Sequence, residues 1–505
     1  MAARAGSGLL AIDLGTSSVK TLVLDQHGHI VGRGRASYPT LHPRPSHDQQ
    51  LLDDWLQATI SAVTSARRFA PNLDIQGVAV TGQMHGTVLF DRAALPIGPA
   101  IIWSDRRVAD EIDALAGMLG PKLAERIGGP LAPGYQAATL AWLRVHRPEM
   151  WSRIDKILLP KDALVYLLTG IATTDPSDAV GTGLLDAESG HWDGDILDRL
   201  GIDPDWLPPV MPSGTPIVPL TVDAAEAMQL AAGIPVIVAG GDAPVAAIGA
   251  GVTDSHAALV VLSTSAQVIR PAHDYRPDSA GRWQTWPSAL PAGANAAKWN
   301  QIGATLNAGR ALTWIRALVA PDATLAELLD RAADVPPVAD GLLFIPYLIG
   351  ERTPLIDPNA RGAFIGLGQA HGADQMARAV IEGVTLAICD ALEHLSSDLP
   401  LQETIQLGGG GASSPVWRQI VADILNARVQ VSGVADLSAH GAARIAAHTL
   451  GWEDISSAPS RTPDRAQLLS PRPEHVARYR ELFTVYRQAA SSLLPLTRAL
   501  RDISR

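Results

Sequence analysis

Two apolar strands, about half the chain apart, each end in a short turn rich in small hydroxyl residues. The first is Leu9–Ile12 with the turn at 15–18, and the second is Ala257–Val261 with the turn at 263–265. Apolar residues resume after each turn, so each pattern predicts an antiparallel hairpin. The repeat favours a duplicated α/β domain whose two hairpins face each other across a cleft. Coincidence is the alternative, because small-residue turns after strands are common.

Short apolar runs alternate with helical patterns along the rest of the chain, which is typical of α/β proteins. Val19–Leu24 is the second strand of the first hairpin, and further strands are expected from His29 to Gly32 and at Gly77–Val80, Pro99–Trp103, Ile234–Ala239 and Thr404–Leu407. Ser104 is a suitable N-cap for a helix that reaches about Leu119. Ser414 and Pro415 favour the start of another helix.

The 505 residues suggest about three domains by length alone. With the repeat taken into account, we expect an N-terminal domain over 1–250, a C-terminal domain over 251–450 and a helical extension over 451–505. Gly249–Asp254 is the candidate hinge. The extension is first rich in Pro and Ser and then helical from Pro473, where Tyr479, Leu482, Phe483 and Tyr486 share helical spacing. That spacing indicates a packing face and not a ligand site.

Composition excludes several classes of protein. Hydrophobic residues make up 47% and charged residues 18%, so the chain is not globally disordered. The net charge of −11 argues against a protein that binds nucleic acid. Cys389 is the single cysteine, which excludes an internal disulfide and a cysteine-based metal cluster, and its helical apolar context indicates a core residue.

The sequence carries no signal-peptide pattern at its start. The nearly uncharged stretch Ala231–Val252 contains Asp242, which would be costly in the middle of a bilayer. A buried strand followed by a helix of small residues explains the stretch better. We therefore expect a cytoplasmic protein with no membrane partner.

Backbone N–H groups in turns of small residues can bind phosphate oxygens. Gly15–Ser18, with Lys20 nearby, is one such turn, but it lacks the P-loop pattern. Gly408–Gly411 is another, but Ser413 and Ser414 stand where a dinucleotide motif needs its last glycine. A P-loop enzyme and a dehydrogenase are thus disfavoured. Tight turns without a ligand are the alternative for each turn taken alone.

Two aspartates follow buried strands. Asp13 could hold a Mg²⁺ that carries nucleotide phosphates, or it could merely cap its turn. Asp242 follows Gly240 and Gly241 and could act as a general base toward a hydroxyl, or it could be an N-cap. The pattern of residues leaves both pairs of alternatives open.

Two further segments suit a polyhydroxylated ligand. The segment 81–86 presents Gln83, Met84 and His85 between two strands, although an exposed hairpin loop is the alternative. Metal binding there is disfavoured because no second ligand stands at a suitable spacing. Trp103 could cover the apolar edge of a sugar, with Asp105 close by, or it could be a core residue.

Taken in order, these segments resemble the FGGY family of carbohydrate kinases, from about Leu9 to Leu450. The similar segments are Asp13–Lys20, Thr81–Gly86, Leu159–Asp162, Asp175–Ala179, Gly240–Asp242, Leu262–Ser265, Gly350–Pro354, Asp357–Gly362 and Leu407–Ala412. Each segment alone is weak, but their common order is highly specific.

The resemblance implies two actin-like, ribonuclease-H-like domains with a ligand cleft between them, and a possible homodimer as a family-level expectation. It implies transfer of the γ-phosphate of ATP, with Mg²⁺, to the terminal hydroxyl of a ketopentose, first of all D-xylulose. It assigns the base to Asp242 and the metal to Asp13. The implied ATP ligands are Asp13, Gly15, Thr16, Ser17, Lys20, Thr264, Ser265, Gly303, Gly410, Gly411 and Ser414. The implied sugar ligands are Gln83, Met84, His85, Trp103, Asp105 and Asp242.

Three departures from the family pattern concern the expected sugar site. Ala243 and Ser104 stand where Asn is usual, and Gln136–Thr139 replaces a usual Pro-Lys pair. Each change removes a hydrogen bond or a charge, so a kinase for another ketose or a polyol, such as ribulose or a sugar alcohol, remains an alternative. An actin-like nucleotide-dependent binding module without kinase activity is a second alternative.

Overall fold

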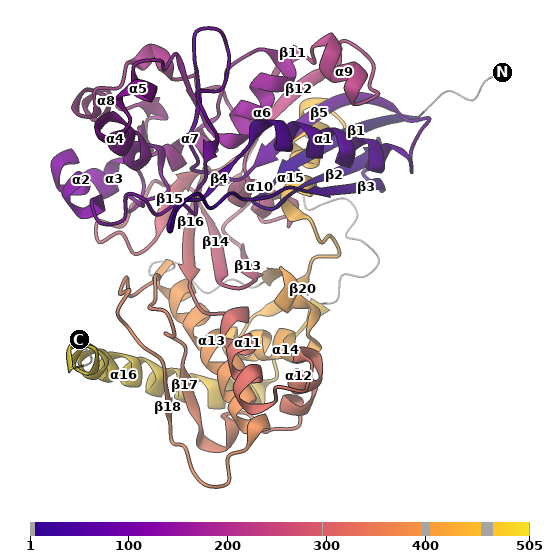
Figure 1. Cartoon of the computed structure of the whole chain (residues 1–505). Coiled ribbons are helices and arrows are strands. Elements are labelled where there is room, and N and C mark those ends of the chain that lie inside the picture. Colours follow the sequence, from indigo (N-terminus) through magenta and orange to yellow (C-terminus); the bar gives the residue numbers. More distant parts are fainter. Residues whose placement is uncertain (1–5, 295, 396–403, 456–467, 504–505) are drawn as a thin grey trace. The chain divides into compact units, whose positions relative to one another are not determined.

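In the computed structural model of this chain, alternate side chains of strand β1 (Ser7–Leu14) enter two different apolar layers. Leu10 and Ile12 join the core that contains helix α1 (Leu52–Arg67), whereas Leu9 and Ala11 join the core of helix α15 (Leu437–Thr449). A strand that is apolar on both faces must be covered on both faces. The first sheet therefore lies between two helical layers (Figure 1).

The structure describes residues 6–294, 296–395, 404–455 and 468–503. It divides into two compact units: unit 1 comprises 1–253, 272–300 and 436–461, and unit 2 comprises 254–271, 301–435 and 462–505. These units differ from the expected contiguous ranges 1–250 and 251–450, because residues 272–300 and 436–461 group with the N-terminal part. The Pro- and Ser-rich stretch at 456–467 lies outside the described residues.

Unit 1 is built on a sheet with the strand order β11-β12-β5-β1-β2-β3. β1 pairs in parallel with β5, β5 pairs in parallel with β12, and β1, β2 and β3 form an antiparallel meander. The other strands of the sheet are β2 (Ser18–Asp25), β3 (Ile30–Ser37), β5 (Asp74–Gly82), β11 (Pro216–Pro219) and β12 (Pro235–Gly241). The strands expected at Leu9–Ile12, Val19–Leu24 and Gly77–Val80 are thus confirmed and slightly longer than predicted, and those expected from His29 and Ile234 begin one residue later. The strand expected at Pro99–Trp103 is shorter and consists only of Ala100–Ile101.

The remaining elements of unit 1 are helical or are short strands. Its helices besides α1 and α15 are α2 (Ile112–Leu119), α3 (Leu123–Arg126), α4 (Gln136–His146), α5 (Pro148–Trp151), α6 (Pro160–Thr169), α7 (Pro176–Ala179), α8 (Gly194–Leu200), α9 (Val222–Ala227) and α10 (Asp242–Gly249). Its short strands are β4 (Gln49–Gln50), β6 (Val88–Phe90), β7 (Ala100–Ile101), β8 (Lys156–Leu158), β9 (Leu185–Asp186), β10 (His191–Trp192) and β15 (Gln284–Pro287).

Unit 2 repeats the strand arrangement of unit 1. Its sheet contains the run β16-β14-β13-β19-β20-β21, in which β13 and β14 form an antiparallel hairpin and β13, β19 and β20 are parallel. The hairpin of β13 and β14 thus corresponds to that of β1 and β2, as the sequence repeat predicted, and the structure adds the correspondence of β19 and β20 to β5 and β12. The strands are β13 (Ala257–Leu262), β14 (Ala266–Ala272), β16 (Trp299–Thr305), β17 (Leu343–Ile345), β18 (Ala363–Ile365), β19 (Thr404–Gly408), β20 (Arg428–Val431) and β21 (Leu468–Leu469).

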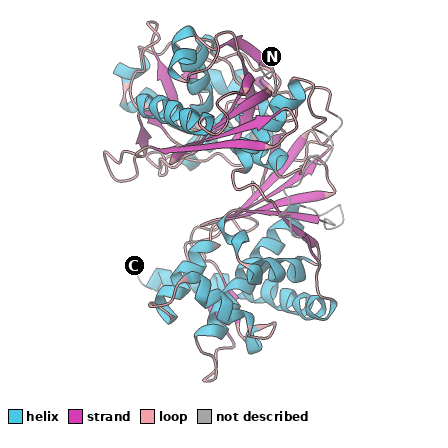
Figure 2. Cartoon of the chain, turned by 90° about the vertical axis from the view of Figure 1, so that its right-hand side faces the viewer, coloured by secondary structure: helices cyan, strands magenta, loops and turns pink. Residues whose placement is uncertain are grey.

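The helices of unit 2, cyan in Figure 2, pack around a buried central helix, α13 (Ala373–Leu395), which carries the buried Cys389. The others are α11 (Gly309–Val319), α12 (Leu325–Ala333), α14 (Pro415–Leu425) and α16 (Pro473–Ile503). The expected packing face of α16 is confirmed, because Tyr479 and Tyr486 are buried and the Tyr479 hydroxyl donates to Glu382 of α13 at 2.6 Å. Ser414 is the N-cap of α14, with Pro415 in its first turn, as the sequence predicted.

One predicted boundary is wrong. The helix expected from Ser104 begins only at Ile112, and its N-cap residue is Glu111. The Ser104 hydroxyl instead donates to the carboxylate of Asp48 at 2.5 Å, which keeps it from capping a helix. Among the described residues, no helix is long and apolar enough to cross a membrane.

Candidate active site

Asp13 and Gly240 meet the same residue of the central strand β5. In the parallel register of the sheet, Asp13 of β1 and Gly240 of β12 both pair with Thr81. The Thr81 hydroxyl also donates to the Gly240 carbonyl at 2.7 Å. Because carboxyl ends of parallel strands share one sheet edge, Asp242, two residues beyond Gly240, lies at the same edge as Asp13.

Asp13 is a buried carboxylate with one ammonium partner. Its side chain is 5% exposed, and its Oδ2 lies 3.8 Å from Nζ of Lys20, the residue opposite it on β2. Burial raises the pKa of Asp13 to about 6, Lys20 lowers it and the nearby Asp436 raises it. Oδ1 of Asp13 is buried and has no hydrogen-bond partner among the described residues. A cation could therefore take that oxygen.

Asp242 is the first residue of helix α10 and not its N-cap, because Gly241 occupies the cap position. Burial and the negative charge of Asp13 raise the pKa of Asp242 to about 7, while the backbone N–H of Ala243 and the charge of Lys20 lower it. A carboxylate whose pKa lies near neutral pH is well matched to accept a proton from a hydroxyl.

The turn between β1 and β2 exposes backbone donors. The N–H of Gly15 donates to Ser18 and the carbonyl of Thr16 accepts from Gln50 at 2.7 Å, but the N–H groups of Thr16 and Ser17 have no partner within the described chain. The hydroxyl of Tyr38 donates to the Gly15 carbonyl and so stabilises the turn. Two unpartnered N–H groups in one turn form a place for an anion.

Gln50 connects this turn to the segment that carries Gln83. The amide of Gln83 donates to Oε1 of Gln50 at 3.0 Å, and Gln50 itself donates to the Thr16 carbonyl. Gln83 is 1% exposed, and its own Oε1 lacks a partner among the described residues. Met84 is buried against Gly241, where a Cβ atom would lie 2.8 Å from its sulfur. Sequence reasoning missed Gln50 because it lies in a two-residue strand without a motif.

His85 is held in a defined orientation by three contacts. Its Nδ1 lies 2.8 Å from the carbonyl oxygen of Gly181, which fixes this nitrogen as the donor. Its ring stacks on Tyr135 with centroids 4.5 Å apart, and Trp286 meets it edge-on at 5.5 Å. Gln136 donates to the Gly86 carbonyl at 3.0 Å and supports the loop from the other side. An ordered imidazole beside aromatic rings suits a sugar ligand.

Trp103 and Asp105 differ in what they present. Trp103 is 45% exposed, and its indole N–H donates to the Thr16 hydroxyl at 2.9 Å. Asp105 is 1% exposed, and its two oxygens accept from Arg107 at 2.8 Å and from the N–H of Asp48. Trp103 therefore offers an accessible ring beside the first turn, while Asp105 anchors the segment that carries it. A direct contact of Asp105 with sugar stays a prediction.

In unit 2, the turn between β13 and β14 is fastened to the start of helix α11. The carbonyls of Ser263 and Thr264 accept from the N–H groups of Gly309 at 2.8 Å and Arg310 at 3.0 Å. The N–H groups of Thr264 and Ser265 have no partner in the described parts of the chain. The second turn thus repeats the unpartnered donors of the first.

A glycine loop lies beside this second turn. A Cβ at Gly411 would lie 2.7 Å from Leu262, the last residue of β13, whereas a Cβ at Gly410 would meet no atom within 4 Å. Gly410 is therefore open to a flat ligand, and Ser414 caps the helix behind it. Gly303 is different: a Cβ there would lie 3.0 Å from Thr353 and from Val268, so this glycine serves close packing. Its contact with ATP stays a prediction.

The residues around Asp13 fit a magnesium ion better than a transition metal. No group of three or more His, Cys, Asp or Glu side chains able to hold a metal occurs among the described residues. Mg²⁺ is commonly bound by one or two carboxylates together with water and substrate phosphates. The unpartnered Oδ1 of Asp13 supplies one such carboxylate oxygen.

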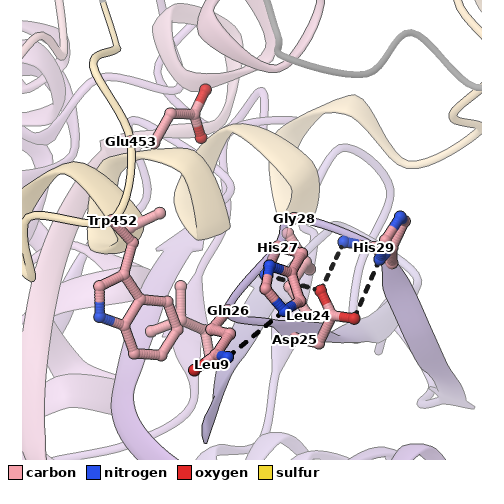
Figure 3. A pocket seen from close by; sticks show the side chains of 10 residues that line it. Leu9, Leu24, Asp25, Gln26, His27, Gly28, His29, Trp452 and Glu453 are labelled. Atoms are coloured by element: carbon pink, nitrogen blue, oxygen red, sulfur yellow. Dashed lines mark hydrogen bonds and ion pairs between the residues drawn. The ribbon is translucent and has the colours of Figure 1, made fainter.

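A pocket of about 580 Å³ opens at the opposite end of the β1–β2 hairpin (Figure 3). Its lining includes Asp25, His29, Trp452 and Glu453, and Asp25 accepts from the backbone and the ring of His29. None of the predicted site residues lines it. It is therefore separate from the edge that carries Asp13 and Asp242.

Models of one protein family match most of the chain. The N-terminal domain model of the FGGY family of carbohydrate kinases covers residues 9–249, and the C-terminal domain model covers residues 258–450. The chain belongs to the FGGY family of carbohydrate kinases, which transfer a phosphate group to an alcohol. This membership confirms the resemblance on which the sequence-based prediction of a sugar kinase rested.

Within that family, the chain is similar to xylulose kinases. It is 31% identical to the xylulose kinase of Bacillus subtilis, over 98% of this chain and 99% of that protein, and 33% identical to that of Staphylococcus xylosus, over 95% and 99%. A gluconokinase of Bacillus subtilis is 28% identical over 95% of both chains.

Solved structures of sugar kinases have the same fold as this chain. A kinase from Brucella ovis described as a "xyloylose kinase" superposes with a TM-score of 0.89 at 30% identity, over 98% of this chain and all of that one. A gluconate kinase from Lactobacillus acidophilus gives 0.90 at 25% identity, over 97% of this chain and 98% of that one. The expected fold of two actin-like domains is thereby confirmed, while the fold alone does not separate one sugar from another.

Proposed function

We propose that this protein phosphorylates D-xylulose at its terminal hydroxyl with ATP, giving D-xylulose 5-phosphate. The observation that carries the proposal is the position of Asp242, at the sheet edge shared with Asp13 and beside the ordered His85 segment. The similarity to xylulose kinases over nearly the whole chain supports this sugar as acceptor.

Asp242 is the general base. Its carboxylate accepts the proton of the terminal hydroxyl while that oxygen attacks the γ-phosphorus of ATP and the bond to the β-phosphate oxygen breaks. The raised pKa of Asp242, about 7, keeps the carboxylate basic enough for this transfer near neutral pH.

The two turns of small residues bind the phosphates of ATP. The unpartnered N–H groups of Thr16 and Ser17 in unit 1, and of Thr264 and Ser265 in unit 2, donate to phosphate oxygens. The N–H of Gly15 donates to the carbonyl of Ser18 within the first turn, and Lys20 adds a positive charge beside it. Adenosine lies near Gly410, Gly411 and Ser414, and a Cβ at Gly410 would meet no atom within 4 Å. Gly303 is also proposed to belong to the ATP site.

Asp13 holds Mg²⁺ through its buried, unpartnered Oδ1, directly or through water. When bound, Mg²⁺ neutralises charge on the phosphate oxygens during transfer. Lys20 keeps Asp13 charged enough to bind the ion, because it opposes the effect of burial on the pKa.

The sugar is oriented by Gln83, Met84, His85 and Trp103. Gln83 offers a buried oxygen that has no partner among the described residues, and His85 offers an imidazole held by Gly181 and Tyr135. Trp103 covers an apolar edge of the sugar with its exposed ring. Asp105 belongs to the sugar site through the turn that it anchors.

We also propose the domain limits 1–250, 251–450 and 451–505, a homodimer and a cytoplasmic location. The family models that end at residue 249 and begin at residue 258 support the first boundary. The need for ATP supports the location, because the cytoplasm supplies this substrate.

A screen of ADP release across D-xylulose, other ketopentoses, ketohexoses, polyols and gluconate tests the proposal. We expect D-xylulose to give the highest kcat/KM. If D-xylulose ranks well below another acceptor, the assignment of D-xylulose as substrate is wrong, but the assignment of kinase activity still holds. ADP release that is indifferent to every sugar would instead favour a nucleotide-dependent binding module.

The base is tested with Asp242→Asn. We expect sugar phosphorylation to be abolished while ATP binding, measured by calorimetry, stays close to that of the wild type. Asp25→Asn is the matched control, because Asp25 lies at the other end of the same hairpin. Substantial turnover by Asp242→Asn would exclude Asp242 as the base.

Gluconate is the second candidate acceptor. The chain superposes on a gluconate kinase as well as on xylulose kinases, and Ser104 and Ala243 replace residues usual near the sugar. The presence of gluconate in the screen distinguishes the two acceptors.

A further inference from the structure

Lys161 lies in a buried cluster of carboxylates that the proposed reaction does not use. Its side chain is completely buried, and its Nζ lies 2.5 Å from Asp162, 3.1 Å from Asp175 and 3.5 Å from Asp178. Burial alone would favour the neutral amine, but the three carboxylates outweigh it and raise the pKa of Lys161. The ammonium is therefore charged and holds the cluster together.

Asp175 links the Lys161 ammonium to helix α7. Its Oδ1 meets the ammonium, while its Oδ2 accepts from the Ser177 hydroxyl at 2.6 Å, the Ser177 N–H at 3.1 Å and the Ser213 hydroxyl at 2.7 Å. Asp175 is thus the N-cap of α7 and fixes the rotamer of Ser177.

Ser177 in turn holds the backbone in front of the proposed base. Because its hydrogen points to Asp175, its oxygen is an acceptor, and the N–H of Gly241 donates to it at 3.2 Å. Gly241 immediately precedes Asp242. A Cβ at Gly240 would lie only 2.5 Å from the same oxygen, so the turn is closely seated on Ser177.

The other end of the same segment meets the proposed sugar site. The carbonyl of Gly181, four residues after Ser177, is the partner of His85 Nδ1 at 2.8 Å. Residues 175–182 therefore contact both the turn that carries Asp242 and the imidazole assigned to the sugar. Asp175, which begins this segment, is in turn in contact with Lys161.

We propose that Ser177 is a positioning residue for phosphoryl transfer: held by Asp175 and Lys161, its oxygen fixes the Gly241 N–H and thereby the direction of the Asp242 carboxylate. This inference rests on the proposed role of Asp242 as the base. Small displacements of a reacting group cost much of the rate, which makes such a contact valuable.

The test compares Ser177→Ala with Ser213→Ala in the full-length protein. Both substitutions remove one buried hydroxyl that donates to Oδ2 of Asp175, but only Ser177 contacts the turn before Asp242. We expect Ser177→Ala to lower kcat about 10- to 100-fold per folded molecule. KM for ATP should not change, because Ser177 is not hydrogen-bonded to either phosphate-binding turn within the described chain. Ser213→Ala should keep kcat within about twofold.

Thermal unfolding and ATP-binding stoichiometry give the folded fraction by which each kcat is divided. Equal kcat values for the two alanine variants would overturn the inference. If Ser177→Ala does not fold, Ser177→Cys and Ser213→Cys, which nearly preserve volume but weaken the hydrogen bond, are compared in the same way, and equal values again overturn it.

Failure of this inference can be distinguished from failure of the proposed function. An active Asp242→Asn variant would exclude Asp242 as the general base. An inactive Asp242→Asn variant together with a fully active Ser177→Ala variant would keep the base and exclude the positioning role.

Discussion

The ammonium of Lys20 lies 3.8 Å from the carboxylate of Asp13, its direct neighbour across the β1–β2 hairpin. Asp436 approaches the same ammonium to 3.7 Å, so two carboxylates share one lysine. At the corresponding place in the second hairpin, Val261 pairs with Gln267. The two units therefore repeat the turn with its unpartnered donors, but only unit 1 carries the charged pair.

This pair acts on Asp242 with opposite signs. The charge of Asp13 raises the pKa of Asp242 and the charge of Lys20 lowers it. We expect Asp13→Asn to move that pKa below its value of about 7 and Lys20→Met to move it higher. NMR titration of the Asp242 carboxyl carbon without metal or nucleotide measures both shifts, with Asp25→Asn as a control that leaves it in place. Shifts of the same sign would contradict this electrostatic picture.

Asp242 should also make stability depend on pH. Its pKa is about 7 in the folded protein, and 3.8 is the value for an unperturbed aspartate, as in the unfolded chain. Between these pH values the folded state therefore holds a proton that the unfolded chain has released. The favourable contribution is complete below about pH 4 and is lost as the pH rises through about 7. We expect Asp242→Asn to be more stable than the wild type at pH 8, with a smaller difference at pH 5. Urea unfolding of the ligand-free proteins measures it, and a difference independent of pH would contradict the expectation.

The sequence predicted those parts of the site in which a local signal coincides with a strand end. Asp13 and Asp242 follow apolar runs, and the parallel sheet brings such strand ends to one edge. The prediction that Ser104 caps a helix was wrong because its hydroxyl donates to Asp48, which is distant in the sequence.

Contacts between distant segments could not be predicted in this way. Lys161 and Asp175 each lie in a segment that resembles the family pattern, but neither has a local pattern that pairs it with the other. Gln50 links the first turn to Gln83 from a strand of two residues. Such partners are set by tertiary packing, which leaves no periodic trace in a single sequence.

Gly240 should not tolerate a side chain. Its φ of +138° is unfavourable for other residues, and a Cβ would lie 2.5 Å from Ser177 Oγ and 2.8 Å from Ala289. We expect Gly240→Ala to lower the free energy of unfolding by about 1–3 kcal/mol and to lower kcat. Gly233→Ala is the control, since it has a φ of +87° but its Cβ would meet no atom within 4 Å. Equal kcat losses in both variants would show that strain alone, and not the contact with Ser177, is responsible.

Removal of the Lys161 ammonium should destabilise unit 1 strongly. Lys161→Met keeps most of the volume but leaves Asp162, Asp175 and Asp178 buried without their cation. Breaking a buried ion pair from one side costs about 3–5 kcal/mol, because the remaining charges are left uncompensated. Lys156→Met is the matched control: its ion pair with Asp155 spans 2.7 Å but is about one third exposed, so its loss should cost less than about 1 kcal/mol. Chemical denaturation of both variants measures the difference, and similar losses would mean that the buried cluster does not depend on Lys161 for its stability.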